Sequence, residues 1–115
     1  MQVVQLTTGY SNTALGYNTM GAMTTGADNV AIGDSCFATA SSASATQNTF
    51  IGRNCASAAV ANTGNVAIGY STYSSATSGL ENVVIGRQAG DAITTSGGNV
   101  MVGAYAGGAV NNWIF

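Results

Sequence analysis

The chain of 115 residues is predicted to be an all-β protein, a parallel β-solenoid of about six 17-residue rungs. A pentapeptide of Asn, Val or Thr, a variable residue, an aliphatic residue and Gly occurs six times, with successive Asn residues 17, 19, 17, 17 and 17 positions apart. Repetition at a short fixed period is the sequence signature of a solenoid, whose rungs bury their apolar faces only against one another. The chain also has 16 Gly and no Pro, which suits tight turns between short strands that keep every backbone N–H for hydrogen bonding.

The three residues after each repeated Asn are predicted to form a short strand. Side chains alternate across a strand, so the first and third residues face one way and the central residue faces the other. Both faces are apolar, whereas a solenoid made of one chain has a single core, so identical chains around a symmetry axis are the most economical cover for the second face. We assign that inter-chain packing to the central residues, which are Ala14, Ala31, Phe50, Ala67, Val84 and Met101.

The two ends of each predicted strand carry the invariant residues of the repeat. The Asn side chains either form an amide ladder between rungs or satisfy the backbone of their own turns, and both roles are structural. The Gly residues are expected at a corner that needs a positive φ or a close backbone approach. The Asn column is Asn12, Asn29, Asn48, Asn65, Asn82 and Asn99, and the Gly column is Gly16, Gly33, Gly52, Gly69, Gly86 and Gly103.

The segment after each corner Gly is predicted to form a second, solvent-facing strand, and a turn such as Thr77-Ser78-Gly79 then closes the rung. Cys36 and Cys55 share one position on adjacent rungs, where a disulfide is within reach, although two buried free thiols are the favoured interpretation. Phe37 and Tyr73 are expected to pack against a neighbouring chain. Two extra residues between positions 34 and 47 predict a bulged loop.

The whole chain, residues 1–115, is expected to be a single repeat domain, and such a domain can be a segment of a longer fibre. Within it, residues 1–11 are expected to hold an incomplete first rung. Residues 111–115 are expected to hold a cap or a junction to another domain.

The repeat resembles a known group of fibrous proteins. The segment from Asn12 to Met20, followed by Thr24-Thr25-Gly26 and the next Asn-Val-Ala-Ile-Gly, resembles the repeats of phage tail fibre proteins. It is also similar to the heads of trimeric autotransporter adhesins, whose somewhat shorter repeats make the 17-residue period favour the tail fibres. This resemblance implies a left-handed parallel β-roll, assembled as a homotrimer in an extracellular appendage that meets a cell surface.

The composition excludes several classes of function. Charged residues make up 5% of the chain and His is absent, so Ser-His and Cys-His dyads and the usual metal sites are excluded. A net charge of −2 gives no electrostatic footprint for nucleic acid, and no segment is apolar and long enough for membrane insertion. We therefore expect no enzymatic activity and no cofactor.

The position directly after the corner Gly is the best candidate for surface recognition, with a host cell-surface glycan or protein as partner. Asp34 is expected to pair with Arg53, and Tyr70 to lie between Arg53 and Arg87. The same stacking has an alternative interpretation, in which it only stabilises the rod. The candidate recognition residues are Tyr17, Asp34, Arg53, Tyr70 and Arg87.

The expected function is that of a structural and adhesive segment of a trimeric phage tail fibre, which supports attachment of the virion to its host. The alternatives are the head of a trimeric autotransporter adhesin on a bacterial surface, and the subunit of a self-assembling extracellular filament.

Overall fold

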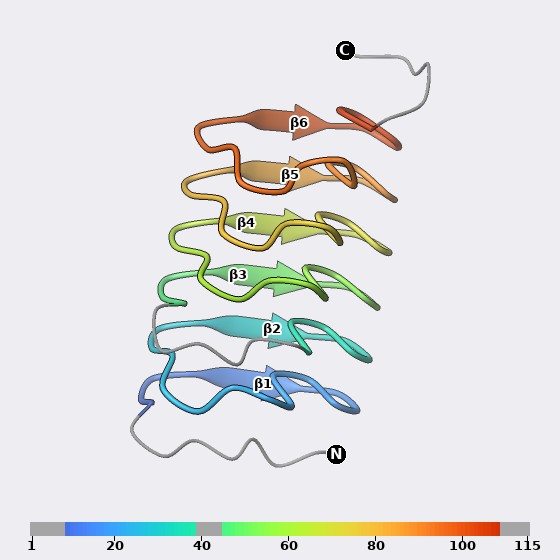
Figure 1. The fold of residues 1–115 in the computed structure, drawn as a ribbon. Helices are drawn as coiled ribbons and strands as arrows, with labels where there is room; N and C mark the ends of the chain where they lie inside the picture. Colours follow the sequence, from blue (N-terminus) through green and yellow to red (C-terminus); the bar gives the residue numbers. More distant parts are fainter. Residues whose placement is uncertain (1–8, 39–44, 109–115) are drawn as a thin grey trace.

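The computed structural model describes residues 9–38 and 45–108, which form a single parallel β-solenoid (Figure 1). Its six strands of three residues are stacked in chain order in one sheet. They are β1 (Thr13–Leu15), β2 (Val30–Ile32), β3 (Thr49–Ile51), β4 (Val66–Ile68), β5 (Val83–Ile85) and β6 (Val100–Val102). No helix occurs in these two ranges. The predicted all-β parallel solenoid is confirmed, while the left-handed coiling of the chain and its assembly as a homotrimer stay predictions.

The strands pair in strict register from rung to rung. Ala14 pairs with Ala31, Ala31 with Phe50, and the same rule holds up to β6. Each position of the repeat is therefore a physical column of side chains that runs along the rod. The 19-residue interval between Asn29 and Asn48 causes no shift in this register. Residues 39–44, where part of the bulged loop was expected, lie outside the described residues.

The segment after the corner Gly forms turns, so the prediction of a second strand there is wrong. In most rungs two residues of this segment have left-handed φ, for example Ser35 at 56° and Phe37 at 54°. The alternation bends the chain sharply while its N–H groups still bond to the neighbouring rungs, as in Ser35 N–H to the Tyr17 carbonyl of the preceding rung at 2.8 Å. A short second ladder of isolated bridges instead lies two residues before the Asn, from Tyr10 to Leu80.

All six corner Gly residues have the expected positive φ, and all except Gly103 also have the expected close approach of backbone from the next rung. Their φ angles lie between 129° and 136°, a region that other residues rarely adopt. A Cβ atom on Gly33 would also lie 2.6 Å from the carbonyl oxygen of Gly52 on the next rung. Since both causes act at the same position, only Gly fits there.

The core lies between the strands and the turn segments of the chain itself. The central strand residues Ala31, Phe50, Ala67 and Val84 are fully buried in it, and Ala14 and Met101 pack against it at the two ends. Their expected role in inter-chain packing is therefore wrong. The physical reason is the Asn at the start of each strand, whose inward amide turns the central residue inward as well, because side chains alternate.

The largest core side chains come from both sides of the rung. The rings of Phe37 and Phe50 meet edge to face with centroids 4.9 Å apart, and Tyr73 lies 6.4 Å from Phe50. Phe37 and Tyr73 are fully buried. Both were expected against a neighbouring chain, and the structure instead places them in the chain's own core.

Candidate functional site

The first and third residues of the six strands form an apolar strip on the outside of the sheet, here called the outer strip. Ten of its side chains are aliphatic and two are Thr, and none carries a charge. All are half-buried or exposed, with Leu15 54% and Val100 76% exposed. The strip consists of Thr13, Leu15, Val30, Ile32, Thr49, Ile51, Val66, Ile68, Val83, Ile85, Val100 and Val102.

The sequence interpretation placed the uncovered apolar face on the central residue of each strand. The structure places it on the first and third residues, which form the outer strip. The alternating apolar pattern predicts two apolar faces, but it does not say which face the solenoid encloses. The signal that decides this is the Asn, because an amide that bonds to its copies on neighbouring rungs has to lie inside. One apolar face of the sheet is thus left uncovered by the chain, as expected.

The six repeated Asn side chains form a continuous amide ladder through the interior. In each of the five links from Asn12 to Asn99, the Oδ1 of one Asn accepts from both the Nδ2 and the backbone N–H of the Asn on the next rung, at 2.9–3.1 Å. The second Nδ2 hydrogen goes to a backbone carbonyl, for example from Asn48 to Asn62 at 2.8 Å. The amide of an interior rung thus uses all of its hydrogen-bonding capacity.

The hydroxyl of Tyr73 joins this ladder, which the sequence interpretation missed. Its oxygen lies 2.7 Å from Asn82 Nδ2 and shares one hydrogen of that amide with the Ser96 carbonyl, and it lies 3.3 Å from Asn65 Oδ1. Burial raises the pKa of the Tyr73 phenol above its ordinary value, and the hydrogen bond from Asn82 opposes this. Two rungs have an aromatic residue at this position of the repeat, Phe37 and Tyr73. Only Tyr73 has a hydroxyl group that can reach the amides.

Cys36 and Cys55 are free thiols buried in the core. Their Sγ atoms donate to the carbonyls of Phe50 at 3.3 Å and Ala67 at 3.2 Å. The hydrogen bond with Cys36, and then burial, raise the pKa of the Cys55 thiol far above its ordinary value. A neutral buried thiol is a poor nucleophile, so these residues pack and the geometry gives them no reactive role.

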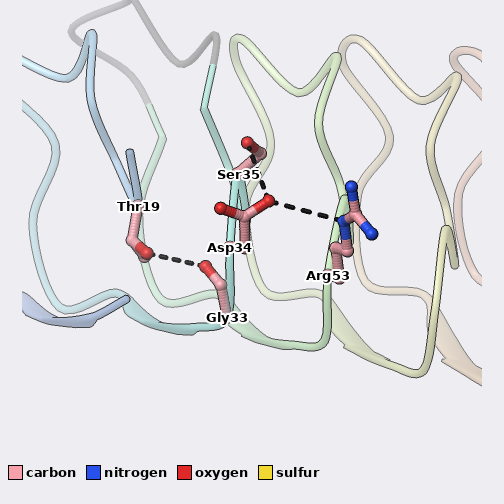
Figure 2. A network of polar contacts seen from close by, with 5 residues as sticks. All are labelled: Thr19, Gly33, Asp34, Ser35 and Arg53. Atoms are coloured by element: carbon pink, nitrogen blue, oxygen red, sulfur yellow. Dashed lines mark hydrogen bonds and ion pairs between the residues drawn. The ribbon is translucent and has the colours of Figure 1, made fainter. Parts of the chain in front are cut away.

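The candidate recognition column lies around the corner from the sheet. The Arg53 Nε and Asp34 Oδ2 are 3.5 Å apart, in the expected ion pair, with 66% and 44% of the two side chains exposed (Figure 2). Tyr17 and Tyr70 are 72% and 46% exposed. An exposed ion pair contributes about 0–1 kcal/mol to stability, so it orients these groups more than it holds the rod together.

The cation–π contact in this region differs from the expected one. The Arg87 guanidinium lies 5.6 Å from the centroid of the Tyr105 ring on the next rung, and the described residues show no cation–π contact between Arg87 and Tyr70. Sequence interpretation missed Tyr105 because it occupies the position after the column. The available signal was an aromatic residue in a position that holds only polar residues on the other rungs, such as Ser71 and Gln88.

The described residues offer no group of three or more Cys, Asp or Glu side chains that could hold a metal ion. In the same ranges, no helix has the length and apolar character to cross a membrane.

What the arrangement offers chemically is two surfaces, the uncharged outer strip and the exposed Tyr, Asp and Arg column.

No family model, curated protein or solved structure matches the chain.

Proposed function

We propose that the chain is a non-enzymatic structural and adhesive segment of a phage tail fibre, assembled as a homotrimer through the outer strip, which supports attachment to the host surface. The observation that carries this proposal is the outer strip itself. Soluble monomers rarely leave a contiguous apolar surface of this kind uncovered, and such surfaces mark interaction sites.

The low charge of the chain supports assembly. Ordinary soluble domains have about a quarter of their residues charged, whereas this chain has 5%. A surface with so few charges suits a subunit that is largely covered by its neighbours. The resemblance to tail fibre repeats then favours three copies and a left-handed coil.

The repeated contacts of the interior support a structural role for the rod. Every joint between the interior rungs repeats the same strand register and the same amide hydrogen bonds. A rod of this kind holds its outward side chains at fixed heights. The column with Tyr17, Asp34, Arg53, Tyr70 and Arg87 is the surface proposed to meet a host glycan or protein.

The test is the mass of the assembly in solution, measured by light scattering or sedimentation equilibrium. We expect a particle of three chains at micromolar concentration. The substitution Ile68→Asp, at the centre of the outer strip, is expected to give folded monomers because it places a charge in the interface. The control is Ser75→Asp, at an exposed position outside the strip, which leaves the trimer intact. A monomeric wild-type chain would contradict the proposal.

The same rod also fits the head of a bacterial trimeric autotransporter adhesin or a self-assembling extracellular filament. The reading frame around these residues separates the three: neighbouring tail genes support the fibre, and a membrane-anchoring barrel or coiled-coil stalk downstream supports the adhesin. Filaments that grow from the purified chain, seen by electron microscopy, support the third.

A further inference from the structure

The two borders of the outer strip differ in charge. The acidic border, two residues before the first strip residue of each rung, carries Asp28 and Glu81, both exposed, and no basic residue. The basic border, two residues after the last strip residue, carries Asp34, Arg53 and Arg87, so two Arg less one Asp give it a formal charge of +1. An uncharged strip thus separates a negative edge from a positive edge.

The border charges that have no ion pair in the described part of the chain are Asp28, Glu81 and Arg87. Asp34 and Arg53 neutralise each other on the basic border. Arg87 lies over the Tyr105 ring, which orients the guanidinium but leaves its charge in place. The described part of the chain contains no ion pair for Arg87 or for Glu81. Both residues belong to the rung of β5, on opposite borders of the strip.

We propose that the outer strip packs against the outer strip of a second copy of this chain, in parallel and in register, with Glu81 of one copy paired to Arg87 of the neighbouring copy. This inference rests on the proposed self-association, to which it adds the orientation of the copies and the residues that select it.

The geometry of the borders favours this orientation. When the symmetry axis is parallel to the rod, the same rung of each copy lies at the same height, and the strands of the copies point in different directions around the axis. The acidic border of one copy therefore meets the basic border of the next. Two copies related by an axis along the strands would run antiparallel and would place acidic border against acidic border. That arrangement brings the rung of Asp28 beside the rung of Glu81, and like charges across an interface are unfavourable. In the parallel arrangement Asp28 instead faces Asp34, whose charge is neutralised by Arg53 of its own chain.

A charge swap at the two borders tests the proposal. The variants Glu81→Arg and Arg87→Glu are each expected to raise the dissociation constant of the assembly about ten-fold, because each places like charges in contact. The double variant Glu81→Arg with Arg87→Glu restores the pair and should return the constant to within about two-fold of the wild type. Sedimentation equilibrium measures the constants, and circular dichroism checks the fold of each variant.

The control variant is Ser75→Arg, which also introduces an Arg, at an exposed position away from both borders, and should leave the constant unchanged. If Glu81→Arg instead tightens the assembly, the copies are antiparallel and the proposal is overturned. It is also overturned if the double variant stays as weak as the single ones. A wild-type chain that never associates removes the proposed function together with this inference, whereas a failed rescue in a stable assembly removes the inference alone.

Discussion

At the scale of single residues, the repeated Asn decides the structure. An amide group has two N–H donors and two acceptor sites on its oxygen. These are enough for each Asn to bond to the rung before it and to the rung after it. Its inward position fixes which strand residues are buried. The Asn pattern was visible in the sequence, but the ladder and the local turn were equally compatible with it, because the choice depends on contacts between residues 17 positions apart.

The interior of the ladder should be far more sensitive to substitution than its end. Asn65→Ala removes hydrogen bonds to Asn48, Gly79 and Asn82 in a buried site and is expected to cost about 3–5 kcal/mol of unfolding free energy. Asn99→Ala, at the half-buried end, should cost about 1 kcal/mol, since Asn82 Oδ1 keeps the backbone N–H at that position. Urea denaturation measures both, and equal losses would argue against the ladder as the main stabilising element.

The corner Gly residues allow the steric clash to be separated from the cost of the backbone conformation. Gly33 and Gly103 have similar φ angles of 133° and 129°, but an added Cβ meets the Gly52 carbonyl in the first case and nothing within 4 Å in the second. Gly103→Ala should therefore cost about 1–3 kcal/mol for conformation alone. Gly33→Ala should cost clearly more, about 4 kcal/mol or above. The two denaturation curves would coincide if conformation were the only cause.

The buried phenol of Tyr73 makes stability depend on alkaline pH. Its folded-state pKa lies above the ordinary value of 10.0, so above that pH the unfolded chain loses this proton first. The stabilising contribution is complete below pH 10 and is lost as the pH rises towards the folded-state pKa. Between about pH 8 and about pH 12 the denaturation midpoint should fall more steeply for the wild type than for Tyr73→Phe, which keeps the other tyrosines. Parallel pH profiles would contradict this origin.

At the scale of the elements, the sequence predicts the strands well and the turns poorly. Val, Ile and Thr between Asn and Gly identify a strand, because these residue types favour extended backbone and the flanking Asn and Gly mark its ends. The segment after the corner was predicted as a strand because its small residues recur. The left-handed φ of residues such as Met20, Phe37 and Tyr73 carries no sequence signal, since these residue types rarely adopt it. Contacts with the neighbouring rungs impose that conformation.

The two faces of one strand should respond differently to the same change. Ala67 is fully buried in the core and Ile68, next to it in β4, is on the outer strip. Ala67→Asp is expected to unfold the chain, because a carboxylate without a partner is placed in an apolar interior. Ile68→Asp should keep the circular dichroism spectrum of a folded chain and change only the mass of the assembly. A folded Ala67→Asp variant would show that the assignment of the two faces is wrong.

At the scale of the whole molecule, the repeat predicts a rod, whereas the surfaces it exposes depend on details outside the repeat. The positions that recur, such as Asn29 and Gly33, build the solenoid. The positions that do not recur, such as Glu81 and Arg87, distinguish its borders, and the repeat itself does not predict which charge stands there. The number of copies in the assembly leaves no trace in the spacing of a single chain.

The identical joints between rungs have a consequence for how such a rod changes in length. Because each joint uses the same register and the same amide contacts, a gain or loss of one 17-residue unit in the interior alters the rod by one strand spacing, about 4.8 Å, and creates no new kind of contact. The gene can therefore lengthen or shorten the rod in whole steps by duplication or deletion. The 19-residue interval shows the complementary freedom, since extra residues placed away from the strand leave the stack in register.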